Sequence, residues 1–580
     1  MQKDEVLLKH NNEWLHFTNP HQIISAENIN DVRKALREIE RLIETNNWHA
    51  AGFISYEAAP AFDNALHVLK SEGFPLLWFG LYSEPHSIKT SEVFSDELKL
   101  GGFQPDFRSF DARESYNAAI KKVKDYIALG KTYQVNYTMR LGSEFTGSEW
   151  GLFSRLAQTQ NKYAAYIDTG RHVICSASPE LFFKLDGDRI YSHPMKGTAQ
   201  RGRITSEDKT QAEWLHNSIK NRAENVMIVD MIRNDLGRIA EVGSVQVPGL
   251  FTIEKYPTLF QMTSTVQAKT HASLDEIFSA LFPCASITGA PKVSTMNIIA
   301  ELETTPRKIY TGSIGYISPN RKAQFNVAIR TALIDRETQS AEYGVGGGIV
   351  WDSTSADEYS EALLKARVLI EPPLEFSLIE TLLWTPADGY FLREKHLERI
   401  CDSADYFGFV FSQDIFENYL NELAQGFQSA RRVRILLDRD GTLSAEDKPH
   451  QENKPNFTVR LADAPVDSRD RFLFHKTTRR EIYGIMRAPH PLADDVLLYN
   501  ERSELTEFTI GNLVVELNGE LVTPPISCGL LAGTFRAHLL ETGKIKERVI
   551  HKDELKKCSK IFLINSIRKW VKIIIKEGDS

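Results

Sequence analysis

The interruption at Glu371-Pro372-Pro373 constrains the fold of this chain more than any other feature. Proline lacks a backbone donor and keeps the preceding residue out of the helical region, so no helix or central strand continues through it. A new apolar run then starts at Phe376. We therefore expect two domains, 1–370 and 374–580, with the weakest signals over 1–100.

Both structural periods occur before this boundary. Residues 163–167 and 189–192 form short apolar runs typical of strands, whereas 212–232 has helical spacing. We expect a large α+β domain of layered sheets and helices, followed by a part of the right size for one α/β domain.

Composition limits the class of protein. With 580 residues, 42% hydrophobic and 25% charged, the chain is too long for a single core and ordinary enough to be globular. It has no run of ~20 apolar residues and no apolar leader core, which favours the cytoplasm and no membrane association. The five cysteines are scattered, which favours free thiols over a disulfide framework or a zinc site. A net charge of −8 argues against nucleic acid as partner.

A single lysine, Lys196, stands among small residues in the segment 193–202, where we expect a turn. A lysine in such a place can act as a nucleophile if its amine is neutral, which requires a desolvated site or a cationic neighbour.

Three glutamates are candidates for a magnesium site. Apolar residues at Val226, Ile228, Val229 and Ile232 put Glu224 near the start of the expected buried face of its helix. Glu358 and Glu361 share one helical face at a spacing of three. Magnesium takes few protein carboxylates and keeps water and substrate oxygens, so glutamates from two distant segments suit it. Taken singly, each is more typical of a solvated surface charge.

Glycines could serve an anion site. Gly346, Gly347 and Gly348 belong to a glycine-rich run that is either a flexible turn or a place where backbone amides approach an anion closely. Thr288 and Gly289 offer donors in the same way.

Three further residues could act on a carboxylate substrate. Arg330 could clamp a carboxylate through two hydrogen bonds or form a structural ion pair, and Tyr310 could add a hydroxyl. Glu180 precedes an apolar strand that would desolvate its carboxyl group and raise its pKa.

The segments 193–202 and 220–238 together resemble the chorismate-utilising enzymes, specifically component I of aminodeoxychorismate synthase. The resemblance implies magnesium at Glu224 and Glu361 with support from Glu358, and anion binding by the glycine-rich run and the Thr-Gly pair. It also implies that Glu180 is the general acid/base. Lys196 would attack C2 of chorismate as the C4 hydroxyl leaves, and ammonia would then add at C4 to give 4-amino-4-deoxychorismate.

Several positions help to distinguish the branches of the family, which make different products from chorismate. Related anthranilate and isochorismate synthases usually have alanine where Lys196 stands, so this lysine favours aminodeoxychorismate; anthranilate synthase component I with an appended domain is the alternative. Asn221 replaces a usually acidic residue, and Gln261 stands where relatives often have histidine. No cysteine has the context of a glutamine amidotransferase nucleophile, so a separate glutaminase subunit would supply ammonia.

Beyond Phe376 the chain resembles fold-type IV pyridoxal-phosphate enzymes, which include aminodeoxychorismate lyase and several aminotransferases. The motifs that carry the resemblance contain Arg399, Lys476, Glu507, Gly533 and Thr534. The resemblance implies that Arg399 and the helix opened by Gly533 and Thr534 bind the cofactor phosphate, that Lys476 carries the cofactor, and that Glu507 pairs with the pyridine nitrogen.

This resemblance leaves the activity of the second domain open. An aminodeoxychorismate lyase would release pyruvate and 4-aminobenzoate, whereas a transaminase would act on an amino acid. A degenerate scaffold, or a non-catalytic module that recruits the glutaminase, is the third possibility. Enzymes of this fold type generally dimerise, so a homodimer is expected.

Overall fold

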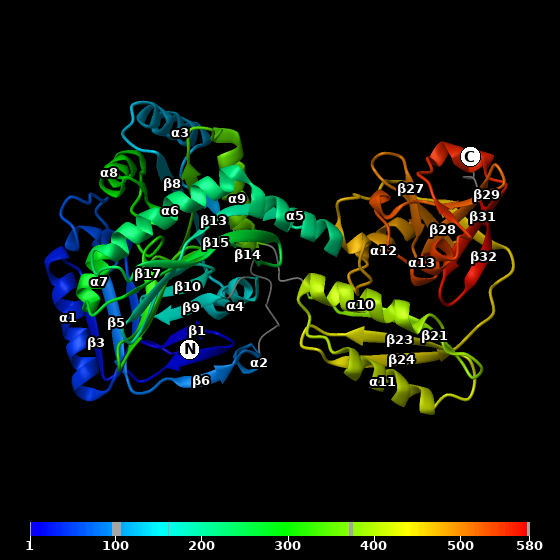
Figure 1. Cartoon of the computed structure of the whole chain (residues 1–580), viewed down its shortest axis with the longest axis horizontal. Helices are drawn as coiled ribbons and strands as arrows, with labels where there is room; N and C mark the ends of the chain where they lie inside the picture. The colour runs from blue at the N-terminus through cyan, green and yellow to red at the C-terminus, as the bar shows by residue number, and fades with distance from the viewer. Residues whose placement is uncertain (1, 95–105, 160–161, 371–374, 577–580) are drawn as a thin grey trace. The chain divides into compact units, whose positions relative to one another are not determined.

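The computed structural model describes residues 2–94, 106–159, 162–370 and 375–576 (Figure 1). The chain forms two compact units, the first made of Met1–Ala199 and Trp214–Pro373 and the second of Gln200–Glu213 and Leu374–Ser580. The proline interruption expected at the domain boundary lies outside the described residues. Helices and sheets occur in both units, which confirms the predicted fold class.

The first unit contains two ten-stranded sheets. One has the order β16-β8-β20-β19-β10-β9-β1-β2-β6, with β7 paired to β8. Its strands are β1 (Val6–His10), β2 (Glu13–Phe17), β6 (His86–Lys89), β7 (Arg108–Ser109), β8 (Gln134–Glu144), β9 (Tyr163–Asp168), β10 (His172–Ser178), β16 (Gly289–Ala290), β19 (Thr331–Asp335) and β20 (Ser340–Ile349).

The other sheet has the order β13-β15-β12-β11-β18-β17-β4-β5-β3, with β14 paired to β15. Its strands are β3 (Gln22–Ala26), β4 (His49–Ile54), β5 (Leu77–Tyr82), β11 (Leu181–Asp186), β12 (Arg189–His193), β13 (Met195–Gln200), β14 (Gln246–Lys255), β15 (Leu259–Lys269), β17 (Ser313–Ser318) and β18 (Lys322–Val327). The strands expected over 163–167 and 189–192 are therefore present as β9 and β12.

The two sheets pack face to face. Ile167 and Ile174 of the first sheet share one buried cluster with Phe53 and Ile314 of the second, so apolar side chains fill the space between the sheets. Helices cover the outer faces and make a layered α/β/β/α unit. They are α1 (Ile29–Asn46), α2 (Thr90–Val93), α3 (Arg113–Ala128), α4 (Glu149–Thr159), α6 (Ile219–Gly237), α7 (Leu274–Leu281), α8 (Lys292–Leu302) and α9 (Ser355–Ile370), with short 3-10 turns η1 (Tyr56–Ala61) and η2 (Ala285–Ile287).

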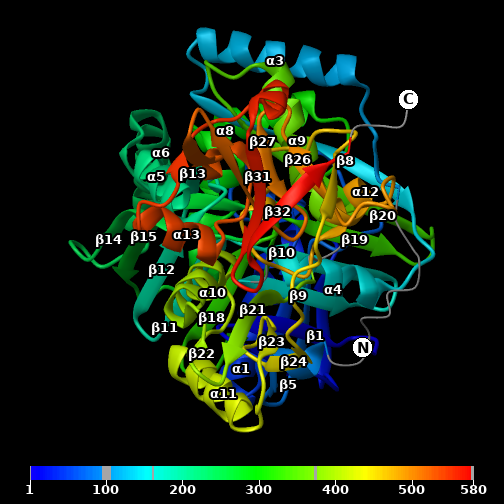
Figure 2. The ribbon, with the colours of Figure 1, turned by 90° about the vertical axis from the view of Figure 1, so that its right-hand side faces the viewer.

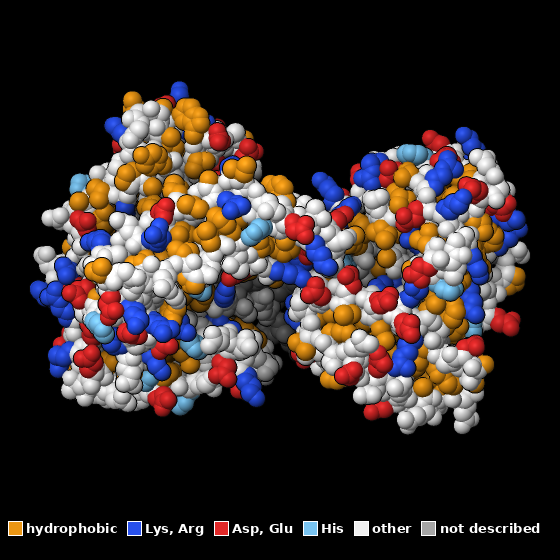
Figure 3. Space-filling model, viewed as in Figure 1, with side chains coloured by type: hydrophobic (Ala, Val, Ile, Leu, Met, Phe, Trp, Pro, Cys, Tyr) orange, Lys and Arg blue, Asp and Glu red, His pale blue; other side chains and the backbone are white. Residues whose placement is uncertain are grey.

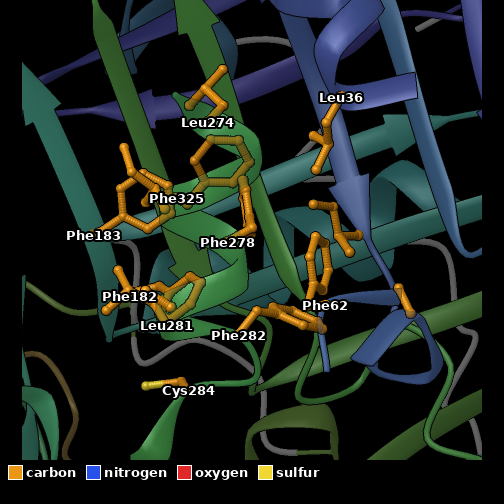
Figure 4. Packing of buried hydrophobic residues seen from close by; sticks show 14 of the residues in the cluster. Leu36, Phe62, Phe182, Phe183, Leu274, Phe278, Leu281, Phe282, Cys284 and Phe325 are labelled. Carbon is orange, nitrogen blue, oxygen red and sulfur yellow. The ribbon is translucent and has the colours of Figure 1, made fainter. Parts of the chain in front are cut away.

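Aromatic packing joins the second sheet to its covering helices. Phe183 of β11, Phe325 of β18 and Phe278 of α7 point toward one another (Figure 4), and the Phe278 and Phe325 ring centroids lie 5.1 Å apart. Edge-to-face pairs of this kind add about 0.5–1.5 kcal/mol beyond area burial. This cluster fixes β11, and with it Glu180 at the strand's entrance.

The helical stretch expected over 212–232 is divided. α5 (Thr205–Asn217) ends before Ser218, whose side chain caps α6 by accepting a hydrogen bond from the Asn221 backbone N–H. The prediction that Val226 lies on the buried face was wrong, because its side chain is 39% exposed. Asn225 is buried in its place and accepts a hydrogen bond from the Ser264 hydroxyl at 2.6 Å.

The second unit contains two sheets of different design. A four-stranded sheet has the order β22-β21-β23-β24, formed by β21 (Leu378–Thr385), β22 (Gly389–Tyr390), β23 (Arg431–Leu437) and β24 (Leu443–Pro449). Two helices, α10 (Arg393–Phe407) and α11 (Gln413–Gln425), bury their apolar sides against it. Alternate residues of β23, Val433, Ile435 and Leu437, are buried in that contact, as a half-buried strand requires.

The larger sheet has eight strands in the order β27-β26-β25-β32-β31-β28-β29-β30, and an extra β27–β28 pairing closes six of them into a ring. β31 and β32 lie side by side in it (Figure 2). The strands are β25 (Phe457–Leu461), β26 (Asp495–Tyr499), β27 (Leu505–Phe508), β28 (Gly511–Leu517), β29 (Glu520–Thr523), β30 (Lys546–Glu547), β31 (Lys560–Asn565) and β32 (Lys569–Ile575). The accompanying helices are α12 (Glu481–Arg487) and α13 (Thr534–Glu541), with 3-10 turns η3 (Arg471–Leu473), η4 (Ile526–Cys528) and η5 (Lys552–Lys557).

The surface carries charges of both signs. On the face in view, Lys and Arg side chains lie among Asp and Glu side chains on each unit (Figure 3). Within the described residues, no helix has the length and apolar character needed to cross a membrane.

Candidate active sites

Lys196 lies on β13 rather than in the expected turn, because this segment pairs with β15 at the edge of the sheet. Burial lowers the pKa of its amine, and Lys365 lowers it further, while Glu180, Glu224 and Glu361 act in the opposite direction. The amine therefore has a larger neutral fraction than an exposed lysine. A neutral amine is the nucleophilic form.

Glu180 stands between β10 and β11 and is 4% exposed. Burial raises the pKa of its carboxyl group to about 7, although the Ser286 hydroxyl and Lys196 pull it down. This confirms the prediction that the following strand desolvates the group. Its Oε1 atom has no hydrogen-bond partner within the described part of the chain. A carboxyl group with this pKa can give or take a proton near neutral pH.

The glycine-rich run is a strand, β20, and not a flexible turn. Gly346, Gly347 and Gly348 lie opposite residues 136–138 of β8. A Cβ atom on Gly348 would come within 3.1 Å of Lys196 Nζ and 2.4 Å of Gln134 Nε2, and one on Gly347 within 3.1 Å of Glu358 Oε2. The absence of side chains here lets the lysine and glutamate approach the strand.

Gln134 was not predicted from the sequence. It is 1% exposed at the start of β8, and its Nε2 atom donates no hydrogen bond to any described residue. Leaving a buried donor unpaired costs about 1–3 kcal/mol, so this amide is suited to a bound acceptor. One polar residue among several in a strand gives no signal of such a role before the fold is known.

Thr288 and Gly289 adjoin Gln134. Gly289 has a φ of 139°, and a Cβ atom there would come within 2.1 Å of the Gln134 carbonyl oxygen, so only glycine fits. The Thr288 hydroxyl is 3.3 Å from each of the Cys284 and Ala285 carbonyl oxygens, to which it donates. In this geometry the Thr288 hydroxyl proton is used in the hydrogen bonds of the local turn. The close contact between Gly289 and the Gln134 carbonyl fixes the positions of Thr288 and Gly289.

Arg330 and Tyr310 also face this region. Arg330 forms no salt bridge with an Asp or Glu of the described chain, which removes the structural ion pair considered from the sequence, and it donates at 3.4 Å to the Lys365 carbonyl oxygen. Its charge acts on the pKa of Tyr310 and of Glu361. Tyr310 is buried below Gly344, where a Cβ atom would strike its ring at 2.2 Å. Arg330 is therefore a cation free to pair with a carboxylate.

The three candidate metal ligands come from two helices, Glu224 from α6 and Glu358 and Glu361 from α9. Both Glu224 and Glu361 act on the pKa of Lys196. Glu361 is 2.8 Å from Lys365, whose charge outweighs burial and lowers the pKa of the glutamate. Glu358 accepts a hydrogen bond from Ser353 at 2.6 Å.

These carboxylates fit magnesium in donor type. No group of three or more His, Cys, Asp or Glu side chains among the described residues could enclose a metal ion. Magnesium needs only one or two carboxylates when water and substrate oxygens complete its octahedron. The partly exposed Glu361 leaves room for such additional oxygens.

Asn221 and Gln261, which depart from the family pattern, both lie against the residue after Lys196. Gln261 Nε2 donates to the Gly197 carbonyl oxygen at 2.8 Å. A Cβ atom on Gly197 would come within 3.0 Å of the Asn221 side chain. Both amides therefore support the lysine-bearing strand.

Lys476 lies between η3 and α12 in the second unit, where its carbonyl oxygen accepts a hydrogen bond from the Ile379 backbone N–H of β21 at 2.8 Å. Burial lowers the pKa of its amine to about 7, together with the charges of Arg399 and Arg480; Glu380 and Glu507 oppose the shift. The amine is substantially neutral at physiological pH and suited to attack an aldehyde.

Glu507 on β27 is a buried carboxylate with neutral partners. It accepts hydrogen bonds from the Tyr483 hydroxyl at 2.8 Å and from Asn512 Nδ2 at 3.1 Å. Burial raises the pKa of Glu507 to about 7 despite these donors. A cationic ring nitrogen placed against this group would restore its charged form, so the site fits a protonated pyridine.

The start of α13 is a candidate anion site. Gly533 is the residue before the helix, and a Cβ atom there would come within 1.9 Å of Asn512 Oδ1. Thr534 is buried at the first helical position. Arg399 Nη1 donates to the Ala532 carbonyl oxygen at 3.4 Å, which places its guanidinium beside the free amides of the helix. Helix amides and an arginine together bind a phosphate group.

Two residues behind Arg399 were not predicted. Glu380 Oε1 accepts from Arg399 Nε at 2.9 Å, and Glu380 also pairs with buried His396. Burial raises the pKa of Glu380, but Arg399 and His396 outweigh it and bring it to about 2. His396 Nε2 lies 3.3 Å from the Thr534 hydroxyl. Glu380 therefore holds Arg399 in place as a fixed anion.

Each unit matches a family of known proteins. A family model described as chorismate binding enzyme matches residues 3–371, and one described as amino-transferase class IV matches residues 377–574. Aminodeoxychorismate synthase component 1 of Escherichia coli (strain K12) is 41% identical over 273 residues, 46% of this chain and 59% of that protein. The protein of the same name from Bacillus subtilis (strain 168) is 39% identical over 295 residues, 50% of this chain and 61% of that protein.

A solved structure is also similar to this chain. Anthranilate synthase component I from Streptococcus pneumoniae TIGR4 matches with a TM-score of 0.54 at 25% identity, over 64% of this chain and 92% of that chain. The chain spans about three fifths of the length of the curated relatives.

Proposed function

Because the chain belongs to the chorismate binding enzyme family, we propose that its first unit converts chorismate to 4-amino-4-deoxychorismate and its second unit eliminates pyruvate to give 4-aminobenzoate. One observation carries the proposal: a lysine amine with a lowered pKa stands beside a buried carboxyl group with a raised one. This pair supplies a nucleophile and a proton donor at the same place. Similarity to aminodeoxychorismate synthase component 1 supports the choice of product.

The first step needs both groups. Neutral Lys196 would add to C2 of chorismate while protonated Glu180 gives its proton to the departing C4 hydroxyl, so that water leaves. Ammonia would then add at C4 and displace the lysine from C2, which restores the ring double bonds. Glu180, now ionised, would take the proton that ammonia loses.

Several groups would neutralise the charge of the substrate carboxylates. Arg330 has no carboxylate partner among the described residues and would pair with one substrate carboxylate, while the β20 glycines bring the strand's backbone close. Glu224 and Glu361, with Glu358 beside them, would hold magnesium. The bound ion would neutralise carboxylate charge close to Lys196.

Nitrogen would come from a separate protein. The curated relatives carry the name component 1, which supports a second component in the assembly. We propose that this component is a glutaminase that delivers ammonia. Free ammonium at high concentration would replace it in an assay.

In the second unit, Arg399, Gly533 and Thr534 would hold the phosphate of pyridoxal phosphate, and Glu507 would pair with its ring nitrogen. The bound cofactor would serve as an electron sink for the substrate amine. Lys476 would take the proton from C4 of 4-amino-4-deoxychorismate, the bond between the ring and the enolpyruvyl oxygen would break to leave an aromatic ring, and the proton would be returned to the released enolate to give pyruvate. A neutral amine, favoured by the pKa near 7, is required for this proton transfer.

Product identification tests the proposal. The purified chain is incubated with chorismate, magnesium, ammonium and pyridoxal phosphate, and aromatic products are separated by chromatography and identified by mass. The expected products are 4-aminobenzoate and an equal amount of pyruvate. Anthranilate would instead assign the first unit to anthranilate synthesis, and persistent 4-amino-4-deoxychorismate would exclude the lyase.

A further inference from the structure

A buried arginine, Arg307, lies between α8 and β17 in the first unit, and the proposed mechanism does not use it. Its side chain is 1% exposed and pairs with Glu303, to which Nε donates at 2.9 Å and Nη2 at 2.7 Å. Because removal of either partner would leave an uncompensated buried charge, the pair is a fixed point within the unit.

The guanidinium of Arg307 also reaches two distant segments of the same unit. Nη2 donates to the Asn136 carbonyl oxygen of β8 at 2.8 Å, and Nη1 donates to the Ile287 carbonyl oxygen of η2 at 3.0 Å. Nη1 donates in addition to the Thr311 hydroxyl at 3.3 Å. Together with the two bonds to Glu303, these make five hydrogen bonds, which is the full number of donors in an arginine side chain.

The segments that Arg307 joins each carry candidate substrate-binding residues. Ile287 directly precedes Thr288, and Asn136 lies opposite the glycine-rich run of β20. The Tyr310 backbone N–H donates to the Arg307 carbonyl oxygen at 2.9 Å, so the tyrosine belongs to a turn that begins at the arginine. One guanidinium therefore connects three parts of the candidate site that are distant in sequence.

Asn136 supports the turn formed by residues 285–288 through its side chain as well. Its Nδ2 atom donates to the Ile287 carbonyl oxygen at 3.1 Å, and its backbone N–H donates to the Thr288 carbonyl oxygen at 2.8 Å. The Ile287 carbonyl oxygen thus accepts hydrogen bonds from both Asn136 and Arg307. The turn cannot shift away from β8 without breaking at least one of these bonds.

The same turn contacts the candidate acid. Burial raises the pKa of Glu180, and a hydrogen bond from the Ser286 hydroxyl opposes this shift, as does the charge of Lys196. Cys284 and Tyr256 also lie within electrostatic reach of Glu180. A displaced turn would weaken the Ser286 bond to the ionised carboxylate, so the pKa of Glu180 would rise further.

We propose that Arg307 and Asn136 are positioning residues of the first unit: together they hold the 285–288 turn against β8, and with it the groups that would bind the substrate carboxylates. The inference rests on the proposed binding of chorismate at this site. Because all five N–H groups of Arg307 are used within the protein, the arginine acts through the groups that it holds.

Two variants of different severity test the proposal. Arg307→Lys keeps a positive charge beside Glu303, but a lysine amine cannot span the Asn136 and Ile287 carbonyl oxygens as the planar guanidinium does. Asn136→Ala removes one side-chain hydrogen bond to Ile287 and leaves the charged pair intact.

Arg336→Lys is the matched control. Arg336 also forms a pair through two hydrogen bonds, in which Nη1 and Nη2 donate to Asp168 at 2.9 and 2.7 Å. It directly follows β19, whose last residue pairs with the first residue of β20, so it lies at the end of the sheet remote from the glycine-rich run. Urea unfolding of all three variants measures any general loss of stability.

In Arg307→Lys and Asn136→Ala, we expect the KM for chorismate, assayed with ammonium and magnesium, to rise about tenfold or more, which is the contribution of one hydrogen bond to a charged group. The fall of kcat with rising pH should move to higher pH, because Glu180 would keep its proton longer. Hydrogen exchange at the residue 136 backbone amide, which donates to the Thr288 carbonyl, should become about two- to tenfold faster. Arg336→Lys should change none of these quantities.

If Arg307→Lys does not fold, Asn136→Ala decides the question. An unchanged KM and pH profile in the folded Asn136→Ala chain would overturn the proposal, and so would equal changes in Arg336→Lys, which would indicate a general structural effect. If the unaltered chain does not consume chorismate, the proposed function fails, whereas exchange at residue 136 still decides whether these two residues hold the turn.

Discussion

Gly348 separates two side-chain tips at the candidate site, and Gly348→Ala tests how tightly they are placed. The added methyl would lie 2.4 Å from Gln134 Nε2 and 3.1 Å from Lys196 Nζ. Because both atoms end flexible side chains and Gly348 lies in a strand, the backbone can stay in place while these groups move. The substitution should therefore disturb the chemistry rather than the fold.

The size of the effect follows from these distances. The Gln134 nitrogen must withdraw by about 1 Å to reach ordinary contact and Lys196 Nζ by a few tenths of an ångström, and a misplacement of about 1 Å in a group that positions the substrate costs on the order of 10²-fold in rate. Because the flexible ends of the Gln134 and Lys196 side chains can move away from the new methyl, the loss of stability should be limited to about 1 kcal/mol. By contrast, a methyl on Gly346 would strike the Tyr137 backbone carbonyl at 2.3 Å, which cannot withdraw.

The assay measures chorismate consumption with ammonium and magnesium, together with urea unfolding. Gly348→Ala should lose about 10²-fold in kcat at near-normal stability, whereas Gly346→Ala should be destabilised. Gly237→Ala, whose new methyl would meet no described atom outside its own helix within 4 Å, is the control and should retain both activity and stability. Full activity in a folded Gly348→Ala chain would refute the placement of Lys196 and Gln134 beside this glycine.

Three other predictions concern charged groups. The pKa of Glu180 is raised to about 7, and its protonated form is needed as the acid, so kcat for the first step should fall as pH rises through 7. The same fall in Glu180→Gln would show that another group causes the pH dependence. Glu380→Gln frees Arg399 and should weaken pyridoxal phosphate binding roughly tenfold in an absorbance titration. Pyridoxal, which lacks the phosphate, should bind as before, and an equal loss for both would contradict the account. Glu361→Gln should raise the magnesium concentration for half-maximal activity by at least about tenfold, whereas Asp357→Asn on the same helix should not.

Local signals predicted several elements correctly. Glu180 precedes an apolar strand and is desolvated, and Gly533 precedes helix α13, because the residues next in sequence already indicate both features. The resemblance to known families further predicted which lysines lie near which carboxylates, and the structure places Glu180 within electrostatic reach of Lys196 and Glu507 within reach of Lys476.

Other features depend on packing between distant segments. Gln134 and Glu380 are polar residues within strands, and only the folded chain shows the Gln134 amide nitrogen unpaired and Glu380 paired with Arg399. The error at Val226 arose because α6 buries Asn225 for a hydrogen bond with Ser264, which an apolar pattern cannot indicate. The strand at Lys196 forms because β15 pairs with it, whatever the turn tendency of its small residues.

The central claim is that two lysines in one chain perform successive steps on one substrate. The most direct test first incubates Lys476→Ala with chorismate, magnesium and ammonium, then adds Lys196→Ala with pyridoxal phosphate to the same mixture. We expect 4-amino-4-deoxychorismate to accumulate in the first stage and to disappear in the second, with equal amounts of 4-aminobenzoate and pyruvate formed. Accumulation of anthranilate in the first stage, or an intermediate that persists after the second addition, would contradict the assignment of the two sites.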